Sequence, residues 1–154
     1  MLRGGLDANV LIYAADNRDP AKRDRAQDVL ACLAGERRGV LTAQILGEYF
    51  TTITRKAAFR QDPLSAALRI AEYRRDFAVL NTTADVVEEA ARGVCAHGFA
   101  YYDAQIWATA RLSGIEVVLT EDFADGREVE GVLFIDPFSP KFDVIQFLAE
   151  ESVR

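Results

Sequence analysis

The sequence has few of the side chains that bind zinc or form disulfides: two cysteines and one histidine in 154 residues. Cys32 and Cys95 are far apart and stand in no CxxC pair, which excludes a zinc knuckle and a thioredoxin-like motif. We expect both to be small core residues. A lone histidine cannot supply the imidazole pairs typical of zinc hydrolases, so His97 is expected to act as a charge at a helix C-terminus.

Long apolar segments are also lacking. No run approaches the ~20 residues that span a bilayer, and the first residues show no targeting pattern, so we expect a cytoplasmic protein without a membrane partner. Hydrophobic residues make up 50% of the chain and charged residues 27%, which is typical of a folded protein. The length favours one domain, residues 1–154, with its own hydrophobic core.

The net charge is −6, but the two signs are unevenly distributed. Lysine and arginine outnumber the acids in residues 1–75, whereas acids predominate in residues 76–154. The basic half could hold a polyanion while metal ions neutralise the acidic half; ordinary solvated helix faces are the alternative for each basic residue. The candidate substrate-binding cations are Arg18, Arg55 and Lys56.

Short apolar stretches alternate with stretches of helical periodicity. A short buried strand is expected to end near Asp7, with a turn of helix directly after it. Further strands are expected at 40–41, 77–80, 115–119 and 132–135, and helices at 20–34, 43–59, 62–73, 83–96, 102–112 and 141–150. This alternation predicts an α/β fold, a three-layer α/β/α sandwich around a mostly parallel sheet.

Several acids fall where such a fold binds its ligands, outside the carboxyl ends of the strands. Asp7 follows the first strand, whereas Asp122 and Asp125 follow the strand that ends at Leu119. Asp103 begins a helix whose preceding loop can face the same edge. Each aspartate alone could be a helix cap or a turn residue. Glu48 stands among apolar residues on its helix and therefore needs a partner.

The chemistry of such a cluster points to a metal ion. No lysine or arginine lies close by in sequence, and carboxylates brought together without a cation repel one another and take up protons. Oxygen donors without histidine or thiolate favour Mg²⁺, or Mn²⁺ in its place, and these ions bridge to substrate phosphates. Such a site can activate water and stabilise the leaving oxygen, which is the chemistry of phosphodiester hydrolysis.

Four segments carry a family pattern: LDANVLIYA at 6–14, ILGEYF around Glu48, YYDAQIWATA at 101–110 and LTEDFADG at 119–126. In this order they resemble a PIN domain, and more narrowly the VapC-type ribonuclease toxins of bacterial toxin–antitoxin systems. The resemblance implies a PIN-like α/β/α sandwich and a magnesium-dependent endoribonuclease. It also implies a homodimer and an antitoxin protein that covers the active site.

Carried over position by position, the resemblance implies a role for each acid. Asp7 and Asp103 correspond to the principal metal ligands, and Asp122 to a third ligand, direct or through water. Glu48 would help to hold the metal or orient the attacking water, and Asp125 would touch the metal or support the site.

Two further residues resemble those that hold the metal ligands in place. Asn9 and Thr120 would fix Asp7 and Asp122 by hydrogen bonds, with a structural role in the turn as the alternative.

Unpaired RNA suits such a site, because an unstacked strand lets the metal reach its phosphate. Tyr101, Tyr102 and Trp107 could stack on bases, but core positions are the favoured interpretation for all three aromatics.

Three rival functions remain for comparison. The same ligands would serve a nuclease of related fold acting on DNA, and a PIN module without catalysis could bind only a protein partner. A signalling receiver domain also gathers acids at strand ends but needs a lysine at that edge. Lys22, Lys56 and Lys141 stand in the wrong contexts for that role.

Overall fold

The computed structural model describes residues 1–151, which form a six-stranded sheet in the order β3-β2-β1-β4-β6-β5. Its strands are β1 (Gly4–Leu6), β2 (Gly39–Thr42), β3 (Ala78–Leu80), β4 (Val117–Leu119), β5 (Glu128–Val129) and β6 (Val132–Ile135). All neighbours pair in parallel except β5, which runs antiparallel to β6. The predicted α/β fold with a mostly parallel sheet is therefore confirmed. The strand β5, only two residues long, is not predicted from the sequence.

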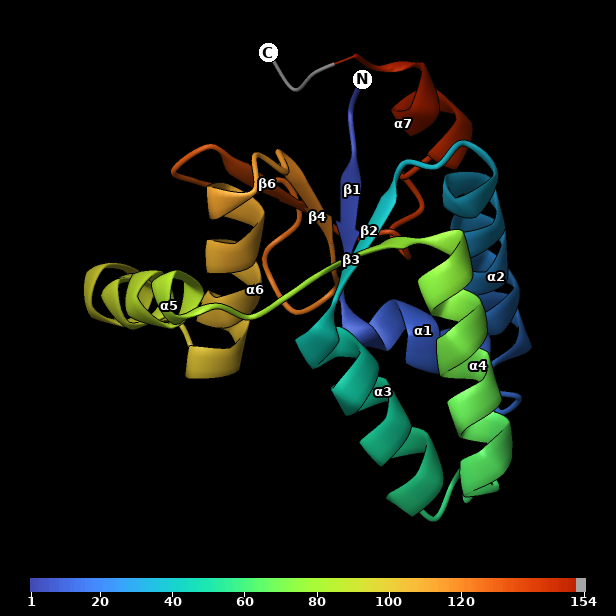
Figure 1. The fold of residues 1–154 in the computed structure, drawn as a ribbon. Coiled ribbons are helices and arrows are strands. Elements are labelled where there is room, and N and C mark those ends of the chain that lie inside the picture. The colour runs from blue at the N-terminus through green and yellow to red at the C-terminus, as the bar shows by residue number, and fades with distance from the viewer. Residues whose placement is uncertain (152–154) are drawn as a thin grey trace.

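Helices cover both faces of this sheet (Figure 1). They are α1 (Ala8–Ala14), α2 (Pro20–Gly35), α3 (Ala43–Arg55), α4 (Pro63–Asp76), α5 (Ala84–His97), α6 (Tyr101–Leu112) and α7 (Val144–Ala149). α5 and α6 lie together on one side, and α2, α4 and α7 lie on the other. The first turns of α1, α3 and α6 come together below the lower end of the central strands in this view. The candidate site lies at this end, on Asp7 before α1, Glu48 in the second turn of α3, Asp103 in the first turn of α6 and Asp122 in the loop after β4.

Polar residues begin several helices where the sequence predicts it. The side chains of Asp19 and Asp62 accept backbone amide bonds at the starts of α2 and α4, each followed by proline. Thr42 and Thr83 do the same for α3 and α5. Such caps satisfy backbone N–H groups that have no partner within the helix.

Three local predictions were wrong. α3 ends at Arg55 rather than near residue 59, because the backbone of Lys56 turns to an extended conformation. Asp103 lies inside the first turn of α6, and Ala100 is the residue that precedes the helix. The two cysteines are not core residues, since Cys95 is exposed and Cys32 is only half-buried.

Trp107 of α6 is fully buried and anchors α5 to the edge of the sheet. A Cβ atom on Gly93 would lie 2.6 Å from its ring, so only glycine allows the two helices to approach this closely. The indole N–H donates to the carbonyl of Val129 in β5 at 3.1 Å. The core position predicted for Trp107 is confirmed.

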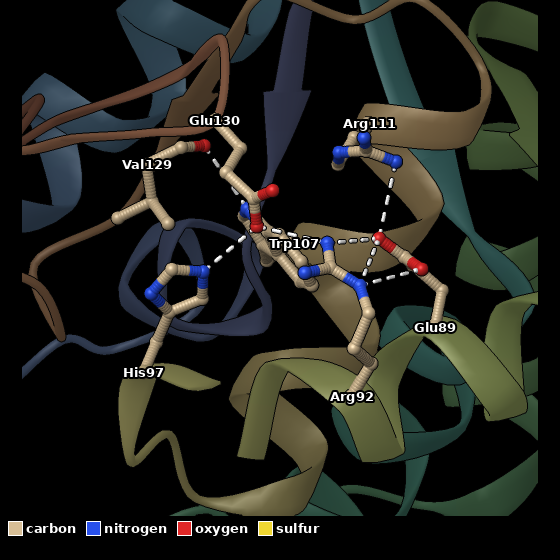
Figure 2. Close-up of polar contacts among 7 residues, drawn as sticks. All are labelled: Glu89, Arg92, His97, Trp107, Arg111, Val129 and Glu130. Atoms are coloured by element: carbon tan, nitrogen blue, oxygen red, sulfur yellow. Dashed lines mark hydrogen bonds and ion pairs between the residues drawn. The ribbon is translucent and has the colours of Figure 1, made fainter. Parts of the chain in front are cut away.

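Ion pairs beside Trp107 join α5 to the turn between β5 and β6 (Figure 2). Arg92 of α5 bonds to Glu89 at 2.6 Å and to Glu130, in the β5–β6 turn, at 2.8 Å. His97 is the last residue of α5, as predicted, and its Nε2 contacts Glu130 at 2.7 Å. The only histidine therefore joins a helix end to a turn.

A buried arginine attaches the C-terminal segment. Arg38, 4% exposed, donates from Nε to the carbonyl of Leu2 at 2.5 Å and from Nη2 to the carbonyl of Glu150 at 2.8 Å. Its Nη1 donates to the carbonyl of Leu148. One guanidinium thus joins the chain before β1 to the end of α7. None of the helices within residues 1–151 is long and apolar enough to cross a membrane.

Candidate active site

Asp7 occupies the centre of the carboxyl edge of the sheet. It follows β1, which lies between β2 and β4, where the strand order reverses. The residue is only 3% exposed. Its Oδ1 accepts the amide of Ala8 at 2.7 Å, so the carboxylate also begins α1. Its Oδ2 accepts the hydroxyl of Thr120 at 2.6 Å.

Thr120 connects Asp7 to the loop that carries Asp122. It directly follows β4 and is 1% exposed, and its amide donates to the carbonyl of Ile135, the last residue of β6. Its hydroxyl oxygen accepts the backbone amide of Asp122 at 3.1 Å. One side chain therefore holds both the carboxylate of Asp7 and the backbone of Asp122, so the hydrogen bonds predicted for Thr120 are present.

The charge of Asp122 acts on both Asp7 and Asp103. Burial, together with the negative charge of Asp122, raises the pKa of Asp7 to about 7, although the hydrogen bonds from the Thr120 hydroxyl and the Ala8 amide act in the opposite direction. Burial also raises the pKa of Asp103, with a further contribution from Asp122. Asp122 is thus the charge that Asp7 and Asp103 share. No ion pair with lysine or arginine relieves these three residues anywhere in the described chain.

Glu48 reaches the site through a glutamine. Gln44, one turn earlier on α3, donates from Nε2 to Oε1 of Glu48 at 2.7 Å and to the carbonyl of Tyr102 at 3.3 Å. Gln105 of α6 donates in turn to Oε1 of Gln44 at 2.6 Å. The two glutamines therefore attach Glu48 to the turn of α6 that contains Asp103.

Two predicted residues make no hydrogen bond to this group. Asp125 is exposed, and its Oδ1 accepts the amide of Asp136 at 2.9 Å, which joins the loop after β4 to the loop after β6. The predicted hydrogen bond from Asn9 is absent in the structure. Both polar atoms of the Asn9 side chain are buried without a partner among residues 1–151.

The predicted cations lie toward the far end of α3. Arg55 is the last residue of that helix and Lys56 follows it; both are exposed. Arg18 makes a two-point ion pair with Asp16, with Nε–Oδ1 and Nη2–Oδ2 distances of 2.9 and 2.8 Å. Its guanidinium lies 5.3 Å from the ring centre of Phe59, just beyond α3. These cations therefore lie beyond the carboxylates in the direction of the C-terminal end of α3. None of them pairs with Asp7, Glu48, Asp103 or Asp122.

Tyr101 and Tyr102 contradict their predicted core positions. They are 36% and 65% exposed and meet edge to face, with 5.3 Å between ring centroids. Both begin α6 and directly precede Asp103. Every residue of α6 from Ala104 to Ala110 is buried, so the middle of the helix is enclosed all round, whereas its first two residues, with their aromatic rings, remain uncovered.

The donor set suits a hard divalent ion held by few protein ligands. Within the described residues, no three His, Cys, Asp or Glu side chains are gathered closely enough to form a complete metal-binding group. Mg²⁺ nevertheless commonly takes one or two carboxylates and completes its coordination with water and substrate phosphate. Asp7 and Asp122, acidic, adjacent and without a cation partner, fit that requirement, with Asp103 beside them.

The fold and the site together define a small α/β domain whose carboxylates lie at the carboxyl edge of a parallel sheet, at the point where the strand order reverses. A family model described as the PIN domain matches residues 6–124. This span covers most of the chain, so the protein belongs to the PIN domain family. No curated protein matched the chain in a sequence comparison.

Solved structures of VapC toxins and their complexes have a similar fold. The VapC20 toxin of Mycobacterium tuberculosis, described as cleaving the sarcin–ricin loop, is 23% identical with a TM-score of 0.60, over 77% of this chain and 91% of that one. A toxin–antitoxin complex from Klebsiella pneumoniae is 19% identical with a TM-score of 0.65, over 88% of this chain and 98% of that one. DNA-bound VapBC from Salmonella typhimurium is 19% identical with a TM-score of 0.61, over 89% of this chain and 99% of that one. At these identities the likeness concerns the fold.

Proposed function

We propose that this PIN protein is a metal-dependent endoribonuclease that hydrolyses RNA phosphodiester bonds in the cytoplasm. The observation that carries the proposal is the group of Asp7, Asp103 and Asp122, in which the charge of Asp122 acts on both of the other carboxyls and no cation pairs with them. Bringing such carboxylates together costs free energy unless a positive charge joins them. A divalent ion together with a phosphate substrate supplies that compensation.

In this proposal Asp7 and Asp103 hold Mg²⁺ or Mn²⁺, with Asp122 as a further ligand, direct or through water. When bound, the ion supplies Lewis-acid stabilisation of the negative charge that develops on the phosphate. Glu48 acts beside it. Its Oε1 is occupied by Gln44, which leaves Oε2 to orient the attacking water and accept its proton.

The surroundings favour an unpaired RNA strand as the substrate. Tyr101 and Tyr102 offer exposed rings beside Asp103, and every nucleobase can stack on an aromatic face. Glu48 and Arg55 are seven residues apart on α3, hence two turns apart on the same face. A strand whose phosphate lies at the carboxylates can therefore extend along α3 toward Arg55 and Lys56, with Arg18 nearby.

We further propose that the protein is the toxin of a toxin–antitoxin pair, a homodimer whose antitoxin covers the carboxylates. The support is the fold shared with toxins solved in toxin–antitoxin complexes. An acidic centre that lies open at a sheet edge needs a cover to be silenced, and a basic side chain of the antitoxin could supply the missing positive charge.

Cleavage assays with labelled RNA and DNA test the proposal directly. Wild-type protein with Mg²⁺ is expected to cut RNA internally, and EDTA or the Asp7→Asn substitution to abolish cutting. Cleavage of DNA alone would replace the proposal with that of a DNA nuclease. No cleavage of either, together with binding to a protein partner, would favour a non-catalytic PIN module. Expression in a bacterial host is expected to arrest growth for the wild type and not for Asp7→Asn.

A further inference from the structure

Glu121, between Thr120 and Asp122, uses both of its carboxylate oxygens in contacts with helices. The hydroxyl of Tyr13, on α1, donates to Oε1 at 2.5 Å. The ammonium of Lys22, on α2, donates to Oε2 at 2.7 Å. A residue next to a proposed metal ligand is thus tied to two helices, α1 and α2.

Aromatic rings enclose the ammonium of Lys22. Its Nζ lies 3.9 Å from the ring centre of Tyr13 and 5.0 Å from that of Phe138. The two rings meet edge to face at 5.0 Å. The side chains of Lys22 and Glu121 are only 26% and 24% exposed. Ion pairs and cation–π contacts gain strength with such partial desolvation, so this cluster differs from an ordinary surface salt bridge.

The cluster, consisting of Tyr13, Lys22, Glu121 and Phe138, joins segments that follow three strands. Tyr13 lies in α1 after β1, Glu121 follows β4, and Phe138 follows β6. The loop of Asp122 is therefore held at two successive residues, by Thr120 on Asp7 and by Glu121 on Lys22 and Tyr13. Asp122 itself is exposed, so its position depends on these neighbours.

We infer that Lys22 is a positioning residue for Asp122, acting through Glu121 and the rings of Tyr13 and Phe138. The inference rests on the proposed function. It assigns Lys22 a role in the geometry of the carboxylates, whereas a lysine near a phosphate-binding edge would ordinarily be assigned to the substrate. The contacts decide between the two roles: the ammonium is already enclosed by a carboxylate and two rings.

Substitutions that remove only the charge test this inference. Lys22→Met keeps the aliphatic stem, and Glu121→Gln keeps an oxygen that can accept from Tyr13. We expect either to weaken Mg²⁺ binding, measured by calorimetry, and to lower kcat, each by roughly tenfold or more, the range typical of residues that orient metal ligands. KM for RNA should stay within about twofold. Lys22→Arg retains a cation that can stack and pair, and should recover most of the loss.

Arg23→Met is the matched control. Arg23 is the next residue on α2, and its guanidinium pairs with Asp24 and Asn17, away from the loop of Asp122. We expect this variant to retain the Mg²⁺ affinity, kcat and KM of the wild type. A similar loss in Arg23→Met would show that the effect of Lys22→Met comes from the general charge of α2, which would overturn the inference.

Hydrogen exchange gives a readout that does not depend on cleavage. In metal-free protein, Lys22→Met and Glu121→Gln should speed amide exchange in residues 120–126, and Arg23→Met should not. If the wild type cleaves no RNA, the proposed function fails while this comparison still decides the positioning role. A rise in KM alone would assign Lys22 to the substrate and overturn the inference, as would unchanged Mg²⁺ affinity and exchange.

Discussion

The hydroxyl of Thr120 donates to Oδ2 of Asp7 at 2.6 Å and accepts the amide of Asp122 at 3.1 Å. Two acidic residues that follow different strands, β1 and β4, are thus held by one oxygen atom. This bond also lowers the pKa of Asp7 against the larger effect of burial. A threonine with no charge of its own therefore controls both the spacing and the ionisation of the candidate site.

Thr120→Val removes this hydroxyl while preserving the branched shape. We expect Mg²⁺ affinity to fall by roughly 10-fold to 100-fold, as for other residues that hold metal ligands, and the pKa of Asp7 to rise above its wild-type value. Calorimetric Mg²⁺ titration and an NMR titration of the Asp7 carboxyl measure the two effects. Thr120→Ser, which keeps the hydroxyl, should behave like the wild type. Equal behaviour of the valine and serine variants would contradict the role given to this bond.

The raised pKa of Asp7 predicts that the metal-free protein loses stability as the pH rises. The folded carboxyl keeps its proton up to about pH 7, whereas its ordinary value is 3.8, so between these values the folded state binds the extra proton. The contribution of Asp7 is complete below about pH 4 and is lost as the pH passes through 7. Urea unfolding in EDTA at pH 5.5 and 8 measures the difference.

Asp7→Asn should remove this dependence and raise the free energy of unfolding at pH 8 by about 1–4 kcal/mol, since one pKa unit corresponds to about 1.4 kcal/mol. Added Mg²⁺ should stabilise the wild type and not the variant. The same pH slope in both proteins would show that the carboxyl of Asp7 does not titrate in this range.

The general architecture and the strand-end acids could be predicted from the sequence because both depend on local patterns. Apolar runs, N-cap residues and the position of Asp7 after a short strand are visible without knowing what packs against what. The contacts of Glu121 and Gln44 could not be predicted in this way. Each reaches a partner far away in sequence, Tyr13 in one case and Gln105 in the other.

The wrong predictions for individual residues also concern contacts that depend on tertiary packing. Tyr101 and Tyr102 were assigned to the core because aromatics on a helix are usually buried, but α6 packs through its following residues. A hydrogen bond was predicted for Asn9, whose side chain is buried without one. The LTEDFADG segment contained a usable signal, because an additional glutamate directly before Asp122 needs its own partner.

The exposed tyrosines should contribute to RNA binding and not to folding. Replacing both Tyr101 and Tyr102 by alanine is expected to weaken binding of unpaired RNA by about 1–3 kcal/mol for each base that loses its stacking partner. Phenylalanine at both positions should preserve binding. Fluorescence anisotropy with Ca²⁺ in place of Mg²⁺ measures the affinity. Leu112→Ala, an exposed position at the other end of α6, serves as the control and should have no effect.

Arg38→Met should destabilise the protein without affecting the carboxylates. It leaves the carbonyls of Leu2, Leu148 and Glu150 without their donor, at an expected cost of about 3 kcal/mol. Chemical denaturation measures the loss. Arg37→Met, at the exposed neighbouring arginine, should change stability by less than about 0.5 kcal/mol. Equal stability of the two variants would mean that the C-terminal segment does not depend on Arg38.

The most direct test is the Mg²⁺ dependence of RNA cleavage in the wild type and in single carboxylate variants. Asp7→Asn and Asp103→Asn should each lower kcat/KM by at least about 1,000-fold, a loss of roughly 4 kcal/mol of transition-state stabilisation, while circular dichroism shows an unchanged fold. Asp85→Asn, at an exposed acid of α5, should cleave RNA as the wild type does. Full Mg²⁺-dependent cleavage by Asp7→Asn or Asp103→Asn would contradict the assignment of the active site to these carboxylates.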